Sequence, residues 1–241
     1  MAAPAPVPAS APPASAPPRA AGPARTPEVG TEPPPPARPA TSRAKRALDI
    51  AVVLVTLPVV AVVGAVVALL VAASSRGPIL FSQERVGLGG RPFKMYKFRT
   101  MRPDAEGRLQ QDAALWDEYV RNGYKLPAEI DRRITRVGRF LRRSSLDELP
   151  QVLNVLLGTM SLVGPRPIVP QELENYGSHR DAYMSVRPGI TGAWQVNGRS
   201  NVDYPERVEY DRQYIESWSL RRDLVILLRT PVAVLTARGA F

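Results

Sequence analysis

The stretch ALDIAVVLVTLPVVAVVGAVVALLVAA, residues 47–73, decides the architecture that the rest of the chain must adopt. Its only charged residue is Asp49. As a straight helix rising about 1.5 Å per residue it would reach about 40 Å. That length exceeds the roughly 30 Å hydrocarbon core of a bilayer. A soluble core helix this long and this apolar is unusual, so the stretch predicts a membrane-inserted helix.

Pro58 divides this stretch near its middle. A proline inside a helix removes one backbone donor and clashes with the preceding turn, so we expect a bend there. Basic residues flank both ends of the stretch, namely Arg43, Lys45 and Arg46 before it and Arg76, Arg85 and Arg91 after it. Because such flanks prefer the cytoplasmic side, a bent, re-entrant helix fits better than a spanning helix, which is the alternative.

The chain before this stretch is dominated by alanine and proline. More than half of the 26 prolines lie in the first 40 residues, including four in a row at 33–36. Such a segment buries too little apolar surface to offset its ordering entropy, and it lacks the basic start and apolar core of a signal peptide. We therefore predict a disordered, partly polyproline-II tail over residues 1–42, either a tether or a dispensable extension.

Composition narrows the chemistry that the chain can perform. It has no cysteine and one histidine, His179, which we expect at the surface. Disulfides, thiolate sites and cysteine nucleophiles are thus excluded, and histidine-based triads nearly so. The net charge of +10 favours an anionic partner, whether nucleic acid, anionic lipid or a phosphorylated substrate. Carboxylates, cations and backbone groups must therefore carry any chemistry, with a hard metal ion where a metal takes part.

After residue 75 the chain has the texture of a globular domain. Residues 79–86 and 92–100 are expected to pair as a β-hairpin across the glycine-rich turn at 87–90. Helices are expected from the spacing of apolar residues over 105–119, 134–141, 149–157, 204–218 and 220–234. The Gly- and Pro-rich residues 158–198 predict loops and turns. Arginines interspersed with the apolar residues of 220–234 predict either an interfacial amphipathic helix or a packed terminal helix.

The most informative stretch for chemistry is SSLDELPQ, residues 144–151. Ser145 and Glu148 have capping-box spacing, which predicts that Asp147 and Glu148 lie in the first turn of a helix. Backbone N–H groups at a helix start favour anions such as a substrate phosphate. Adjacent carboxylates can divide the roles of nucleophile and metal ligand, although ordinary helix-start carboxylates have the same spacing.

Three further stretches carry cations. GPRP at 164–167 holds Arg166 between two prolines, and its guanidinium suits bidentate phosphate binding. KMYKFRTMR at 94–102 makes the second hairpin strand basic, and RPGITGAWQVNGR at 187–199 combines glycines with polar side chains. Each stretch alone also fits a solvated surface or a tight turn. Together with the paired carboxylates they describe a cationic site on a membrane element, which suits phosphoryl chemistry.

Read in order, these segments closely resemble the bacterial sugar transferase family, also called monotopic phosphoglycosyl transferases. The resemblance runs from about residue 43 to the end of the chain. The matching stretches are KRALD (45–49), GPILFSQERVG (77–87), YKFRTM (96–101), RITRVGRFLR (133–142), SLDELPQ (145–151), MSLVGPRP (160–167) and RPGITGAWQVNGR (187–199).

The resemblance implies a reaction. Family members cleave a UDP-sugar with Mg²⁺, pass the sugar phosphate to polyprenyl (undecaprenyl) phosphate, release UMP and so begin polysaccharide or glycoconjugate assembly. On this basis Asp147 is the expected nucleophile, forming a covalent aspartyl phosphosugar, and Glu148 the expected Mg²⁺ ligand. Residues expected to contact substrate are Lys97, Arg99, Arg166, Arg187, Gln195 and Arg199, of which Gln195 and Arg199 are the weaker assignments.

The resemblance also implies an arrangement at the membrane. It assigns the helix break to Pro58 and places both ends on the cytoplasmic face of the inner (plasma) membrane. The expected fold is α+β, a mainly helical membrane-associated domain with a small β-hairpin or sheet and interfacial amphipathic helices. The expected segments are the tail at 1–42, a re-entrant helix at 43–75 and a catalytic domain at 76–241 with an interfacial C-terminal helix.

The competing hypothesis is a non-catalytic membrane-anchored basic protein that binds nucleic acid or anionic lipid. A catalytically silent relative is a third. Binders of single strands interleave cations with aromatic residues, and recognised duplex-binding motifs are absent from the sequence. The pair Asp147 and Glu148 inside the most basic region also disfavours simple polyanion binding. The expected partners are therefore a UDP-sugar, a polyprenyl phosphate and the membrane, without nucleic acid, and a homodimer is compatible with the sequence.

Overall fold

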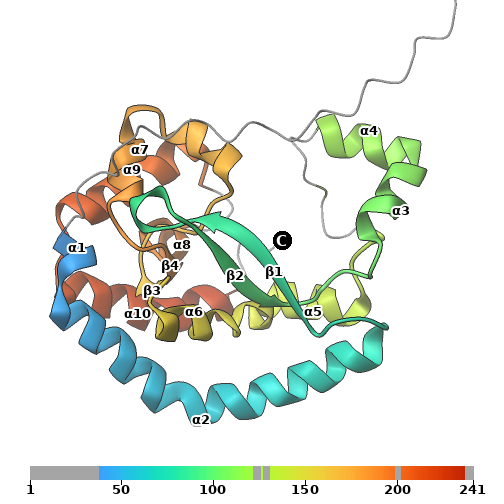
Figure 1. The fold of residues 1–241 in the computed structure, drawn as a ribbon, viewed down its shortest axis with the longest axis horizontal. Helices are drawn as coiled ribbons and strands as arrows, with labels where there is room; N and C mark the ends of the chain where they lie inside the picture. Colours follow the sequence, from blue (N-terminus) through green and yellow to red (C-terminus); the bar gives the residue numbers. More distant parts are fainter. Residues whose placement is uncertain (1–37, 122–125, 127–130, 199–201, 237–241) are drawn as a thin grey trace, which may run out of the picture.

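The computed structural model describes residues 38–121, 126, 131–198 and 202–236. Most of the predicted tail, residues 1–37, lies outside this part of the chain. The elements are α1 (Arg38–Thr41), α2 (Arg43–Ser74), β1 (Leu80–Val86), η1 (Leu88–Gly90), β2 (Pro92–Phe98), α3 (Ala105–Gln111), α4 (Ala113–Arg121), α5 (Arg136–Ser144), η2 (Leu146–Glu148), α6 (Gln151–Leu157), β3 (Ser161–Val163), η3 (Pro170–His179), α7 (Arg180–Met184), β4 (Gly189–Thr191), α8 (Ala193–Asn197), α9 (Tyr204–Glu216) and α10 (Leu220–Leu235). The molecule is mostly helical with small sheets, as an α+β fold requires (Figure 1).

The long helix α2 is one continuous element of 32 residues. Ser42 caps its start, with the side-chain oxygen accepting a hydrogen bond from the backbone N–H of Lys45 at 3.2 Å. Pro58 lies inside the helix, and the Thr56 hydroxyl bonds back to the Val52 carbonyl at 2.8 Å. Both features bend helices. Figure 1 shows α2 as a shallow V whose two ends turn toward the rest of the molecule.

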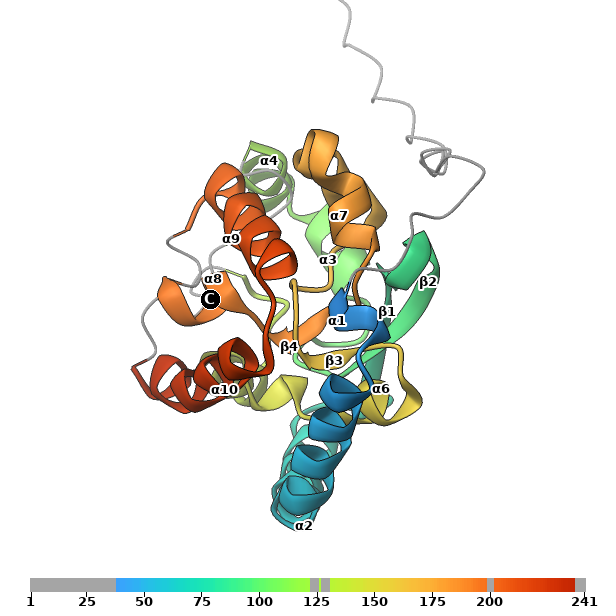
Figure 2. The same cartoon turned by 90° about the vertical axis from the view of Figure 1, so that its left-hand side faces the viewer.

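Each end of α2 is bonded to the globular part. Near the start, the Lys45 ammonium pairs with the Asp223 carboxylate of α10 at 2.8 Å. Just past the end, the Arg99 guanidinium donates to the carbonyl of Ser75 at 2.6 Å. The outer surface of the helix between these anchors is apolar and exposed, through Leu54, Val55, Val59, Val62, Val66 and Leu69. The helix is long and apolar enough to cross a membrane, and it projects away from the other elements (Figure 2).

The hairpin predicted from the sequence is confirmed. Strands β1 and β2 pair antiparallel, with Arg85 opposite Phe93 and Phe81 opposite Lys97. The connection contains Gly89 at φ 67, a left-handed conformation that glycine adopts without steric cost. The hairpin crosses the centre of the molecule and brings the basic strand β2 beside α6 and η2 (Figure 1).

Two apolar clusters fix α2 against the domain. The larger one joins α2 to α6, β3 and α9 through residues such as Val53, Val155, Val163 and Tyr214. The second joins the C-terminal half of α2 to β2 and α5 through Val67, Val71, Phe98 and Leu141. Because α5 and α6 both pack against α2, the segment that joins them is held close to this long helix.

Several sequence expectations need correction. The Gly- and Pro-rich residues 158–198 were expected to be loops, but they contain β3, β4, η3, α7 and α8. The short strands β3 and β4 pair in parallel, which no local pattern indicates. The helix expected over 105–119 is divided at Asp112 into α3 and α4. Residues 38–41, placed in the predicted tail, form α1.

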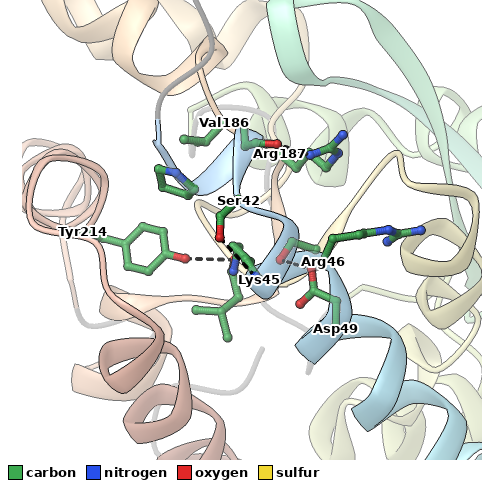
Figure 3. Close-up of a pocket in the computed structure, with 11 residues that line it drawn as sticks. Ser42, Lys45, Arg46, Asp49, Val186, Arg187 and Tyr214 are labelled. Carbon is green, nitrogen blue, oxygen red and sulfur yellow. Dashed lines mark hydrogen bonds between the residues drawn. The ribbon is translucent and has the colours of Figure 1, made fainter.

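Asp49, the only charged residue of the apolar stretch, is bonded to the globular part. Its carboxylate accepts hydrogen bonds from the Ser161 hydroxyl at 2.8 Å and the Leu162 N–H at 3.1 Å. Figure 3 shows Lys45 and Asp49 beside a small pocket with Tyr214 on its other side. The pocket volume is about 10 Å³, room for about one water molecule. This junction is therefore structural packing, with no room for a substrate.

Candidate active site

Asp147 and Glu148 lie in η2, the short 3-10 helix between α5 and α6. Ser145 ends α5 in the left-handed conformation at φ 58, and α6 begins only at Gln151. The capping box predicted for Ser145 and Glu148 is wrong, because Ser145 makes no side-chain capping hydrogen bond at η2. The tight turn still places both carboxylates directly before a helix. The sequence thus located the pair, although it assigned the wrong local geometry.

Lys97 of β2 meets this pair directly. Its ammonium donates to Glu148 Oε1 at 2.7 Å, with both side chains about four-fifths buried. The strand is held in place by Asn154 of α6, which accepts from the Tyr96 N–H at 3.0 Å and donates to the Lys94 carbonyl at 2.7 Å. These two bonds between the Asn154 side chain and the backbone of β2 fix the position of Lys97 relative to α6. The predicted proximity of the basic strand to the paired carboxylates is therefore present in the structure.

The Asp147 carboxyl is nearly enclosed, with 7% of the residue exposed. Burial raises its pKa from 3.8 to about 6, and the neighbouring charge of Glu148 adds to that rise. The charges of Lys97 and Arg142 oppose it. A carboxylate with this pKa is still mostly ionised at neutral pH, and it is poorly hydrated. Both properties favour nucleophilic attack on a bound substrate.

Arg142 is a residue of the site that the sequence reasoning missed, since it entered only as the last residue of the stretch RITRVGRFLR. In the structure its charge acts on Asp147, and its Nε donates to the Thr100 hydroxyl at 3.0 Å. Close packing of α5 makes this possible, because a Cβ at Gly138 would overlap the Thr100 carbonyl. The glycine in RITRVGRFLR was the available signal of a close approach.

Arg166 is exposed on a loop whose neighbours are buried. The loop follows β3 and is fixed by two backbone bonds, from Gly164 N–H to the Thr191 carbonyl at 2.9 Å and from Gly189 N–H to the Pro165 carbonyl at 2.8 Å. A Cβ at Gly164 or Gly189 would overlap the facing backbone. The glycines shared by the two motifs therefore let these loops approach each other, and the result is a rigid platform for Arg166.

A second arginine was missed at this platform. Arg85 of β1 lies near enough to Arg166 and Glu148 for their charges to act on its pKa, which burial lowers. It pairs with Glu172 at 3.6 Å and donates to Gln83 Oε1 at 2.6 Å, while its buried Nε has no hydrogen-bond partner. Lys97 and Arg142 thus act directly on the carboxylates, and Arg85 lies between Glu148 and Arg166 in its electrostatic reach. Such a group of cations can neutralise a diphosphate.

Two arginines that the sequence reasoning assigned to substrate are bonded elsewhere. Arg99 is buried and directed at the end of α2, where it donates to Ser75. Arg187 donates to the carbonyls of Gly158 and Ala40, both at 2.8 Å, and lines the small pocket of Figure 3. The structure does not bring either guanidinium to the carboxylate pair. Both fasten the domain around α1 and α2.

Of the remaining predicted residues, Gln195 is bonded locally and Arg199 is not described. Gln195 of α8 donates to the Ile190 carbonyl of β4 at 3.1 Å, and its buried Oε1 has no hydrogen-bond partner among the described residues. Arg199 lies outside the described residues. His179 is exposed, as expected. The roles predicted for Gln195 and Arg199 stay predictions.

The site can be tested for its fit to Mg²⁺. Among the described residues, no cluster of three or more His, Cys, Asp or Glu side chains could enclose a metal ion. Mg²⁺ does not need such a cage, because it binds one or two carboxylates and completes its shell with phosphate oxygens and water. Asp147 and Glu148 supply hard oxygen donors of this kind, so the residues fit a magnesium ion shared with a diphosphate.

Comparison with known proteins shows the family of the chain. The family model described as "Bacterial sugar transferase" matches residues 40–237. The "Exopolysaccharide production protein ExoY" of Sinorhizobium fredii is 42% identical over 208 residues, which cover 85% of this chain and 91% of that protein. The residues matched by the family model include every element from α2 to α10.

Two longer relatives have names that state a reaction. The "Undecaprenyl-phosphate galactose phosphotransferase" of Salmonella typhimurium is 47% identical over 68% of this chain. The "UDP-glucose:undecaprenyl-phosphate glucose-1-phosphate transferase" of Xanthomonas campestris pv. campestris is 47% identical over 70% of this chain. The matches cover 35% and 34% of these two relatives, about a third of their length.

Proposed function

Because this chain belongs to the bacterial sugar transferase family, we propose that it is the enzyme that moves a sugar 1-phosphate from a UDP-sugar to undecaprenyl phosphate. The observation that carries the proposal is the nearly enclosed Asp147 beside the Lys97–Glu148 ion pair, next to the membrane helix. The names of the relatives support a galactose or glucose donor. ExoY supports a role in exopolysaccharide production. A simple polyanion-binding surface would not require a buried pair of carboxylates.

The proposed reaction has two displacements at one phosphorus atom. In the first, a carboxylate oxygen of Asp147 bonds to the phosphorus that carries the sugar, the bond from that phosphorus to the bridging oxygen breaks, and UMP leaves. In the second, an oxygen of undecaprenyl phosphate bonds to the same phosphorus and the Asp147 carboxylate leaves. The covalent intermediate lets a soluble donor and a lipid acceptor use the same site in turn.

The surrounding cations make the first attack feasible. A carboxylate is repelled by a diphosphate unless positive charge lies close to both. Lys97 and Arg142 lower the energy of ionised Asp147. Arg166, with Arg85 beside it, is positioned to hold donor phosphate oxygens. Mg²⁺ bound through Glu148 would supply further neutralisation of the phosphates.

We propose that the enzyme acts at the cytoplasmic face of the inner membrane. Apart from α2, exposed apolar side chains lie on α5, α6 and α10, at Phe140, Leu153, Leu157, Leu224, Leu228 and Val232. Figure 1 places these helices in a row on the side of the molecule that faces α2. An apolar surface of this kind suits the boundary between headgroups and acyl chains. It would hold the site at the depth of a polyprenyl phosphate headgroup.

The re-entrant course of α2 is part of this proposal. It is supported by the bend near Pro58 and by the bonds that tie both helix ends to the domain. The chain has no cysteine, so Ala44→Cys and Ala73→Cys each introduce a single label site near one end. A membrane-impermeant maleimide is expected to label both variants in inside-out vesicles and neither in intact spheroplasts. Labelling of the two positions from opposite sides would show a spanning helix instead.

The activity is tested with purified, detergent-solubilised protein. We would supply Mg²⁺, undecaprenyl phosphate and UDP-glucose, UDP-galactose or an N-acetylated UDP-sugar, and measure the released nucleotide together with the lipid product. We expect UMP and a lipid-linked sugar diphosphate in equal amounts with one hexose donor. Release of UDP would indicate ordinary glycosyl transfer. Absence of any release from folded protein would favour a non-catalytic role.

A further inference from the structure

The loop that carries Arg166 has one side-chain contact that bridges it. The Tyr183 hydroxyl of α7 donates to the carbonyl of Arg166 at 3.0 Å and accepts from the N–H of Ile168 at 3.2 Å. Tyr183 is 2% exposed, so water does not compete for these bonds. One hydroxyl therefore joins the peptide groups on the two sides of Pro167.

The backbone hydrogen bonds of the loop lie on either side of the Arg166 carbonyl. The Pro165 carbonyl accepts from the Gly189 N–H at 2.8 Å, and the Ile168 carbonyl accepts from the Val86 N–H at 3.0 Å. These bonds fix the two ends of the loop. Between them, the orientation of the Arg166 carbonyl, and with it the direction of the exposed side chain, depends on the hydroxyl.

We propose that Tyr183 is a positioning residue that sets Arg166 for binding the diphosphate of the nucleotide-sugar donor. The inference rests on the proposed function, because it assumes that Arg166 binds phosphate. Tyr183 does not touch substrate in this account. It acts by limiting the motion of the Arg166 backbone, so that less conformational entropy is lost when the guanidinium closes on the phosphate.

A neighbouring tyrosine provides a matched control. Tyr176 packs against Tyr183 with ring centroids 4.7 Å apart, and it is also almost fully buried. Its hydroxyl donates to Asp211 Oδ2 at 2.8 Å, within the helices η3 and α9 and away from the Arg166 loop. Tyr176→Phe therefore removes a buried hydroxyl from the same cluster without loosening the loop.

The experiment measures the affinity of the full chain for UDP by calorimetry in detergent with Mg²⁺. Tyr183→Phe is expected to weaken UDP binding by roughly fivefold to tenfold, as for one lost hydrogen bond. Tyr176→Phe is expected to change it by less than about twofold, with a similar fall in Tm for both variants. Equal UDP affinities for the two variants would overturn the proposal.

A double-mutant comparison shows whether Tyr183 acts through Arg166. Arg166→Ala should weaken UDP binding strongly, and adding Tyr183→Phe should then cause no further loss. A full additional loss in the Arg166→Ala background would overturn the proposal. If wild-type protein does not bind UDP, the proposed function itself fails. If wild type binds UDP and Tyr183→Phe binds equally well, only the role of Tyr183 fails.

A second pair of variants guards against misfolding of Tyr183→Phe. Replacement of Tyr183 by 4-aminophenylalanine keeps a donor toward the Arg166 carbonyl, and replacement by 4-methylphenylalanine fills the same space without one. We expect the amino variant to bind UDP nearly as tightly as wild type and the methyl variant to bind like Tyr183→Phe. The reverse order would contradict the inference.

Discussion

Asp147→Asn is expected to abolish UMP release while leaving the protein folded and inserted in the membrane. The amide has nearly the shape of the carboxylate, but it cannot form the phosphosugar ester, so turnover should fall by roughly a thousandfold or more. The measurement is UMP release with the donor that wild type accepts, with undecaprenyl phosphate present. Wild-type protein without acceptor should release about one UMP per active site, and the variant none.

The same substitution should make the protein more stable at alkaline pH, which separates lost chemistry from lost folding. The pKa of Asp147 is about 6 in the folded protein and 3.8 ordinarily. The folded state therefore binds more protons than the unfolded state between these values, and stability is lost as pH rises through them. Removing the charge should recover up to about 3 kcal/mol above pH 6 in chelator-treated protein, and leave stability near pH 3 unchanged.

Asp181→Asn is the matched control for this prediction. Asp181 is an exposed aspartate in the first turn of α7, so the control makes the same chemical change away from the site. Its UMP release and its stability should equal those of wild type. Normal turnover by Asp147→Asn would exclude the covalent scheme, since the adjacent carboxylate, Glu148, is already bonded to Lys97.

The sequence predicted the parts of the site that depend on local pattern. Adjacent acids followed by a helix, a basic strand after a glycine turn and an arginine between prolines are all visible within a few residues. The structure brings Asp147, Glu148 and Lys97 together as expected. Arg85 and Arg142 were missed because their proximity to the site depends on the pairing of β1 with β2 and on the close packing of α5 against Thr100.

Arg99 and Arg187 were predicted from the sequence to contact substrate, but the structure places both away from the carboxylate pair. Their motifs are as basic as that of Arg166, yet their guanidinium groups bond to backbone carbonyls at Ser75, Gly158 and Ala40. A guanidinium can bind the free carbonyls near a helix end as well as a phosphate. The composition of a motif therefore does not show whether its arginine binds the protein backbone or a substrate. Which of the two an arginine binds depends on the helix ends that the tertiary structure places beside it, and these come from distant parts of the sequence.

For the fold, too, the elements with a local sequence pattern were predicted and those that depend on long-range contacts were not. Helices with clear apolar spacing and the hairpin appear within a few residues of the predicted bounds, because their patterns are local. The strands β3 and β4 have three residues each and pair in parallel across the whole of η3 and α7. Their glycines were interpreted as loop signals. In the structure Gly164 and Gly189 let the two backbones approach, a contact that no window of the sequence contains.

Asp223→Ala is expected to cause the largest loss of stability, by about 3–5 kcal/mol. Asp223 is 1% exposed and accepts three hydrogen bonds, from Lys45 Nζ at 2.8 Å, the Tyr214 hydroxyl at 2.8 Å and Trp218 Nε1 at 3.0 Å. Removing the carboxylate leaves the Lys45 ammonium charged and nearly buried without its partner. It also removes the acceptor of the Tyr214 hydroxyl and of Trp218 Nε1, so these buried groups would lose their hydrogen bonds at the same time.

The position of this network explains why the loss should extend to function. It joins the first turn of the long apolar helix α2 to α9 and α10, so weakening it should loosen this helix from the domain that carries Asp147. Trp218 belongs to this network, and chemical unfolding in detergent can be followed by tryptophan fluorescence. UMP release should fall in proportion to the unfolded fraction, in contrast to Asp147→Asn, which should lose activity while fully folded.

The double variant Lys45→Met with Asp223→Leu tests whether the unpaired Lys45 ammonium causes the loss of stability in Asp223→Ala. It removes both ions and fills their space with apolar groups, a change that is often neutral for buried pairs. We expect it to be clearly more stable than Asp223→Ala, even though it removes more polar contacts. If the double variant is as unstable as Asp223→Ala, the loss comes from the Tyr214 and Trp218 hydrogen bonds. If Asp223→Ala stays within about 1 kcal/mol of wild type, the junction does not hold α2 to the domain as we infer.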